Sequence, residues 1–103
     1  MTVDDLVGVC GRPQPPVSLP TPLLALYWDA RGDWKKAHEV AQGIKAAEGS
    51  LIHAYLHRKE GDHGNAAYWY GQAGRPVNKG TLAEEWRAIA QEICALTAPG
   101  PTG

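Results

Sequence analysis

Two short stretches, residues 32–37 (GDWKKA) and residues 61–66 (GDHGNA), share the pattern G-D-x-x-x-A and lie 29 residues apart. In each stretch the glycine can end one helix, and the aspartate after it can cap the next. Apolar residues at three- and four-residue spacing flank both stretches, which is typical of amphipathic helices. The repeated pattern therefore predicts two units in series, each a helix, a tight glycine turn and a second helix.

Further start and stop signals place the remaining helix boundaries. The first helix is expected to begin near Pro22 and to end at Arg31, before the first glycine turn. Ser50 is expected to cap a helix over residues 51–60. Thr81, with Glu84 three residues later, forms a capping box that opens a last helix. The apolar stripe of that helix consists of Leu82, Trp86, Ile89, Ile93 and Leu96.

These signals predict an all-α chain with about five helices, arranged as two antiparallel hairpins and a C-terminal capping helix. The chain has 103 residues, which is room for one domain. Residues 11–22 hold five of the eight prolines, so residues 1–21 are expected to form an extended, Pro-rich N-terminal arm. Residues 22–98 then form a single helical domain, and residues 99–103 form a disordered tail.

Small residues and turn glycines match between the two units, and these positions, together with one tyrosine, resemble the pattern of tetratricopeptide-type helical repeats. The resemblance implies that paired helices approach closely and that the last helix covers an exposed end of the array. The repeat length departs from that family, at 29 residues instead of about 34. The matching residues are Ala25 with Ala54, Gly32 with Gly61, Ala37 with Ala66, and Tyr70, with Pro76 near the closing proline.

A second resemblance covers residues 23–77. The segments HAYLHRKEGD (residues 53–62), NAAYWY (residues 65–70) and AGRP (residues 73–76) are similar to a signature of small, mainly bacterial proteins without an established activity. This similarity implies a coherent family of domains and supplies no function.

Charge and cysteine content exclude several classes of protein. Ten Lys and Arg stand against eleven Asp and Glu, and no basic cluster occurs, so binding to nucleic acid is not expected. No apolar run approaches the length of about 18 residues that crosses a membrane. The first residues are acidic where a signal peptide is basic, and the two cysteines show no metal-binding spacing. A cytoplasmic protein with reduced thiols is therefore expected.

Three of the four histidines, His53, His57 and His63, fall within eleven residues. On a helix, His53, His57 and Glu60 share one face, a pattern suited to Zn²⁺ or Ni²⁺, to which Asp62 or His38 could add a ligand. The alternative is structural. A helical wheel places these histidines opposite the apolar arc, in water. The repeat alignment instead places His57 where Trp28 lies in the first unit, so that it is buried and needs a partner such as Asp29, Asp62 or Tyr68.

The aromatic residues are four Trp and four Tyr, with no Phe. Tyr and Trp each carry a polar atom and are common in ligand pockets and at interfaces. Polar and aromatic residues of the second unit are therefore candidates for binding a ligand or a partner: His53, His57, Arg58, Asp62, Tyr68, Trp69 and Arg75.

No catalytic arrangement and no phosphate-binding loop occur in the sequence, which argues against an enzyme, and no cofactor is expected. Two hypotheses remain. The first is a small helical-repeat module that binds a protein partner. The alternative is a small-ligand or metal-binding protein, or an enzyme subunit, with a pocket lined by His, Arg, Tyr and Trp. A homodimer through the helix over residues 81–97 is compatible with both.

Overall fold

The computed structural model describes residues 1–97, which form six α-helices and no strand. The all-α prediction is confirmed, and the expected count of five helices is wrong by one. The predicted tail over residues 99–103 lies outside the described residues. The helices are α1 (Val3–Cys10), α2 (Thr21–Ala30), α3 (Trp34–Gln42), α4 (Ala47–Lys59), α5 (His63–Ala73) and α6 (Leu82–Thr97).

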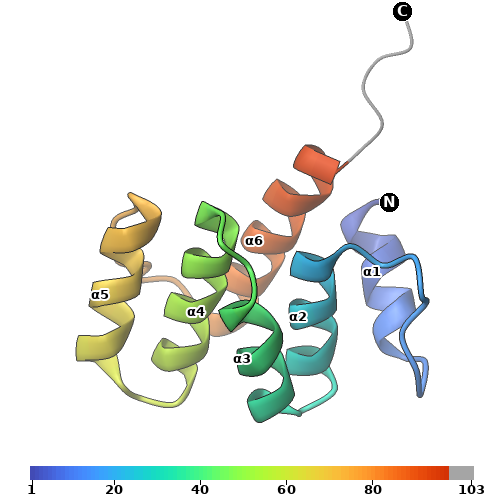
Figure 1. The fold of residues 1–103 in the computed structure, drawn as a ribbon, viewed down its shortest axis with the longest axis horizontal. Helices are drawn as coiled ribbons and strands as arrows, with labels where there is room; N and C mark the ends of the chain where they lie inside the picture. Colours follow the sequence, from blue (N-terminus) through green and yellow to red (C-terminus); the bar gives the residue numbers. More distant parts are fainter. Residues whose placement is uncertain (98–103) are drawn as a thin grey trace, which may run out of the picture.

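Helices α1 to α5 form a row in which each neighbouring pair from α2 to α5 packs together and α1 lies beside α2 (Figure 1). Helix α6 runs across one side of this row and packs on α1, α2 and α4. It therefore covers a face of the row, whereas a capping helix at the end of the array would pack on α5. The reason is that α6 needs an apolar surface for its own stripe, and the buried faces of α2 and α4 provide one.

The N-terminal segment differs from the predicted extended arm, because residues 3–10 form a helix. The side chain of Thr2 accepts a hydrogen bond from the Asp5 backbone, and the Asp5 carboxylate accepts one from the Thr2 backbone, so the helix begins with a capping box. Leu6 and Val9, three residues apart, bury one face of α1. The prolines that favour extended backbone begin only at Pro13, and residues 11–20 are indeed not helical.

The two glycine turns have nearly the same geometry. Gly32 has φ +82° and Gly61 has φ +88°, the left-handed region that glycine adopts without a steric penalty. The Asp33 side chain accepts a hydrogen bond from the Lys36 backbone N–H at 3.0 Å. The Asp62 side chain accepts one from the Asn65 backbone N–H at 3.2 Å. Both predicted caps are therefore confirmed, and so is the capping box of Thr81 and Glu84.

The predicted start of the helix over residues 51–60 is wrong. Helix α4 begins at Ala47, so Ser50 lies inside it and is not its cap. Gly49 also lies inside α4. A Cβ at this position would lie 2.3 Å from the Ile44 carbonyl oxygen, so only glycine allows the chain before α4 to pass this close.

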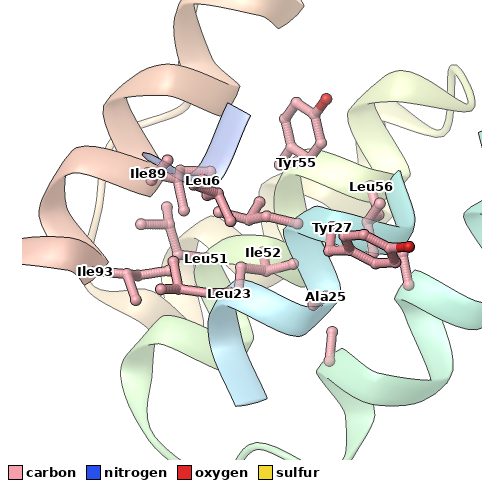
Figure 2. Packing of buried hydrophobic residues seen from close by; sticks show 14 of the residues in the cluster. Leu6, Leu23, Ala25, Tyr27, Leu51, Ile52, Tyr55, Leu56, Ile89 and Ile93 are labelled. Atoms are coloured by element: carbon pink, nitrogen blue, oxygen red, sulfur yellow. The ribbon is translucent and has the colours of Figure 1, made fainter. Parts of the chain in front are cut away.

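The core lies between α6 and the row of helices. Figure 2 shows aliphatic and aromatic side chains from α1, α2, α4 and α6 packed together. Every residue from 51 to 57 is buried, because α3, α5 and α6 all pack against this helix. An amphipathic wheel does not describe a helix that is covered on most sides.

The apolar stripe of α6 is confirmed at Ile89 and Ile93, which are buried, whereas Leu96 is 63% exposed. These residues of the stripe pack within the same chain and are therefore not free to form a homodimer contact. A homodimer through the helix over residues 81–97 stays a prediction. Across residues 1–97, no helix combines the length and the apolar character that crossing a membrane requires.

Candidate functional site

Three imidazoles meet between α3 and α4. His38 comes from α3, and His53 and His57 come from α4, one turn apart. The Nε2 atoms of His38 and His53 lie 2.8 Å apart, and the rings of His53 and His57 are stacked with centroids 5.3 Å apart. One ring nitrogen from each of the three residues lies within 4.8 Å of the other two. We call these three residues the histidine cluster.

The burial of the cluster decides between the two sequence-based interpretations. His53 is 5% exposed and His57 is 6% exposed, so the wheel was wrong to place them in water. The repeat alignment, which matched His57 with an aromatic residue, was right about its burial. The partner of His57 is Glu60, whose Oε1 atom lies 2.6 Å from Nδ1, and not one of the residues expected from the alignment.

Two indoles hold the cluster in place. Trp69 of α5 stacks on His53 with 4.2 Å between ring centroids and 5° between planes. Trp34 of α3 stacks on His38 at 4.8 Å, and its Nε1 donates a hydrogen bond to the Leu56 carbonyl oxygen at 2.8 Å. These flat contacts restrict the rotation of the imidazoles and exclude water from their faces.

Burial also controls the charge of the cluster. Burial, and after it the neighbouring His38 and His57, lower the pKa of His53 to about 4, because a charged imidazole is poorly solvated here and a second positive charge nearby is unfavourable. Burial, followed by the charge of His57, lowers the pKa of His38. At neutral pH both rings are therefore uncharged, and each has a nitrogen lone pair.

The cluster lines a pocket of about 720 Å³ between α3, α4 and α5. Trp69 and Ile44 contribute apolar walls, and polar side chains surround the rest of the opening. The polar lining residues are Gln42, Lys45, Ser50 and Asn65. The histidines are thus accessible to a small solute from one side while the fold covers them on the others.

The remaining predicted site residues lie elsewhere. Arg58 pairs with Glu85 at 2.8 Å, and Arg75 pairs with Glu92. Both of these glutamates lie on α6. Asp62 caps α5, and Tyr68 is exposed on the same helix. Of the seven candidates, His53, His57 and Trp69 line the pocket, and Asp62 has a carboxylate oxygen within 4.8 Å of a His57 ring nitrogen.

A second group of potential ligands consists of His57, Glu60 and Asp62, each with one atom within 4.8 Å of the others. Its two carboxylates are exposed and already engaged. The Glu60 carboxylate accepts from His57, and the Asp62 carboxylate accepts the Asn65 backbone N–H at 3.2 Å. The group is therefore a weaker candidate than the histidine cluster, in which His53 and His57 are buried, His38 is partly buried and all three line the pocket.

His38 was only a secondary suggestion from the sequence, and Trp34 was not predicted to take part at all. A signal for His38 exists, since it lies three residues before the buried Ala41, on the side of α3 that packs against α4. The buried carboxylates of Asp29 and Glu85 left no comparable signal, because nothing local marks an acidic residue as buried.

Comparisons of this chain with protein-family models, with curated proteins and with solved structures find no match. The function is therefore inferred from the chemistry of the residues themselves.

Proposed function

We propose that this chain binds a divalent transition-metal ion, Zn²⁺ or Ni²⁺, through His38, His53 and His57. The observation that carries the proposal is the convergence of three imidazole nitrogens within 4.8 Å in a pocket. Neutral imidazole is the commonest nitrogen ligand of both ions, and three histidines are a known ligand set for zinc. The lowered pKa values of His38 and His53 support it, because protons do not compete with the metal at neutral pH.

The spacing of the nitrogens supports a site that opens slightly on binding. Two Zn–N bonds of about 2.0–2.1 Å at a tetrahedral angle place the nitrogens ~3.3 Å apart. The 2.8 Å between the Nε2 atoms of His38 and His53 is a hydrogen-bond distance, at which the rings share a proton. A bound metal would take the place of this proton, and the two nitrogens would move about half an ångström further apart. His38 is only partly buried and can make this movement.

Three protein ligands leave a fourth position of a tetrahedral ion open. The adjoining pocket of about 720 Å³ has room for water or a small ligand there. An open position is a feature of ligand-binding and catalytic sites, whereas structural zinc sites are closed. We propose metal binding and no reaction beyond it.

The test is calorimetric titration of the metal-free protein with Zn²⁺ and with Ni²⁺ at pH 7. One ion per chain is expected, and His38→Gln is expected to weaken the affinity by at least about tenfold, since one of three ligands is lost. The matched control is His63→Gln, because His63 is exposed on α5 and belongs to neither group of ligands. A dissociation constant weaker than about 100 µM, or equal weakening by both variants, would refute the proposal.

A second proposal keeps the interaction module predicted from the sequence. The matching φ angles at Gly32 and Gly61 support two related hairpins, α2–α3 and α4–α5, of a tetratricopeptide-like kind. Helix α5 ends the row, and its Tyr68 side chain is 55% exposed beside Trp69. An exposed tyrosine at the end of such an array suits contact with a protein segment.

The second proposal requires a partner that binds in a one-to-one ratio and depends on Tyr68. Affinity capture with the wild-type chain and with Tyr68→Ala, followed by identification and direct titration of the captured protein, provides the test. Lys35→Gln on α3 is the control for a general change of surface. Equal binding by wild-type protein and Tyr68→Ala would count against this face.

A further inference from the structure

A second pocket, of about 420 Å³, lies on the other side of α4, where residues of α1, α2, α4 and α6 meet. Most of its wall is apolar and includes Val7 of α1 and Leu82 and Trp86 of α6. Val7 is 46% exposed at this pocket, and an aliphatic side chain left this open gains from an apolar ligand that covers it. The volume falls in the range of pockets for small molecules.

The walls of this pocket are held in place before any ligand arrives. The Trp86 indole donates a hydrogen bond from Nε1 to the Leu26 carbonyl oxygen at 3.3 Å. The Tyr55 hydroxyl donates to Oδ2 of Asp29 at 2.8 Å. Burial raises the pKa of the Cys10 thiol, and the charge of Asp29 raises it further, so Cys10 presents a neutral surface. Fixed walls lower the entropic cost of binding.

The charges at the pocket leave one cation in excess. Asp29 is buried, and both of its oxygens are engaged, one by Tyr55 and the other by Lys59 at 2.8 Å. The Lys59 ammonium has three donors, of which Asp29 takes one. Arg87 lies at the rim with a mostly exposed side chain, and its contact with the exposed Asp4 is long, at 3.5 Å. A negatively charged group is therefore favoured and a cation is not, because Asp29, the carboxylate that lines this pocket, is already paired.

We propose that this pocket binds a small amphipathic carboxylate. Its apolar body lies against Val7, Leu82 and Trp86, and its carboxylate is held by Arg87 and Lys59. Arginine is suited to this group because its planar guanidinium can donate two parallel hydrogen bonds to a carboxylate. The site is separate from the histidine cluster and does not depend on a metal.

The test is a titration of the ¹⁵N-labelled full chain followed by NMR, with octanoate as the probe. 1-Octanol removes the charge and keeps the apolar body, and acetate keeps the charge and removes the body. Octanoate is expected to shift the Trp86 indole N–H and the amides of Val7 and Leu82, and to bind roughly threefold to tenfold more tightly than 1-octanol. Acetate is expected to leave these resonances unchanged.

Two variants assign the charge and the mouth of the pocket. Arg87→Gln is expected to weaken octanoate roughly threefold to tenfold and to leave 1-octanol unchanged. Lys35→Gln, which removes an exposed cation on α3, is the matched control and is expected to change neither. Val7→Asp places a negative charge at the mouth and is expected to abolish octanoate binding. Both Arg87 and Val7 are exposed, so the fold does not depend on them.

Three results would overturn the proposal. The first is equal affinity for octanoate and 1-octanol, which would mean that the pocket takes up apolar solutes without recognising the anion. The second is the same effect from Arg87→Gln and Lys35→Gln. The third is a set of shifts scattered over the surface, or no shift up to the solubility limit of octanoate.

Discussion

Glu60 lies one turn after His57 in the chain, and its Oε1 atom is 2.6 Å from Nδ1 of His57. The imidazole side chain is 8% exposed and the carboxylate side chain is 38% exposed, so the bond anchors a buried ring from the surface. Because Nδ1 donates its proton to the Glu60 carboxylate, Nε2 is the nitrogen of His57 that remains for a metal ion. A carboxylate that holds the far nitrogen of a ligand histidine fixes the tautomer and makes the other nitrogen more basic.

This relationship predicts that Glu60→Gln weakens Zn²⁺ binding by about tenfold to a hundredfold, because Glu60 positions a ligand. Calorimetric titration at pH 7 measures the change, and Glu39→Gln, an exposed carboxylate on α3, is the control. If Glu60 were itself a ligand, together with Asp62, then Asp62→Asn would weaken binding strongly and His38→Gln would not. That pattern would move the metal to the exposed group.

The free energy of unfolding of the metal-free protein is expected to fall as the pH drops from 6.5 to about 4. The pKa of His53 is about 4 in the folded chain against 6.5 ordinarily, so between these values only the unfolded chain carries the proton. Stability from this group is complete above pH 6.5 and is lost toward pH 4. The loss from His53 is at most about 3 kcal/mol, and His38 contributes in the same direction.

Urea unfolding in EDTA at a series of pH values measures this dependence. His53→Phe keeps an aromatic ring against Trp69 and removes the titrating group, so its stability should change less between pH 6.5 and 4.5 than that of the wild-type chain. Equal slopes for the two proteins would show that His53 is not buried as a neutral ring. Carboxylates that titrate near the lower end of this range contribute equally to both.

Two glycine-to-alanine substitutions should have opposite effects on stability. At Gly49 the new Cβ meets the Ile44 carbonyl oxygen at 2.3 Å, and relieving that overlap should cost about 1–3 kcal/mol. At Gly71, inside α5, the Cβ meets no atom within 4 Å, so alanine should stabilise the helix by up to about 1 kcal/mol. Chemical denaturation of both variants is the measurement. A Gly49→Ala variant as stable as the wild type would contradict the close approach of Ile44.

Glu85 is 2% exposed and accepts hydrogen bonds from the Tyr70 hydroxyl at 2.5 Å and from Arg58 at 2.8 Å. Burial and this carboxylate raise the pKa of Tyr70, which keeps the hydroxyl as a donor. Glu85→Ala leaves a cation with no charged partner and should cost about 3–5 kcal/mol. Glu92 lies on the same helix as Glu85 and forms an exposed pair with Arg75. Glu92→Ala breaks that pair and should cost less than about 1 kcal/mol. Similar losses in the two variants would show that the buried pair contributes little.

Local interactions made a large part of the fold predictable. The turn glycines at positions 32 and 61, their capping aspartates and the box formed by Thr81 and Glu84 each involve residues within a few positions of one another. The start of α1 is equally local, since Thr2 and Asp5 form a capping box, but the nearby prolines suggested extended backbone. Ser50 was a misleading signal for the start of a helix, because α4 already begins at Ala47. The glycine before Ser50, Gly49, is required by the close packing of Ile44.

The sequence by itself determined where most helices begin and end, because turns and caps depend on the conformations and hydrogen bonds of neighbouring residues. The tertiary structure alone decided that His38 lies against His53 and that Asp29 pairs with Lys59, which are 15 and 30 positions apart. It also decided that α4 is covered on most sides, so that its histidines are buried. Such pairings depend on how helices rotate and pack against one another, and that is set by the apolar surface the whole chain buries together.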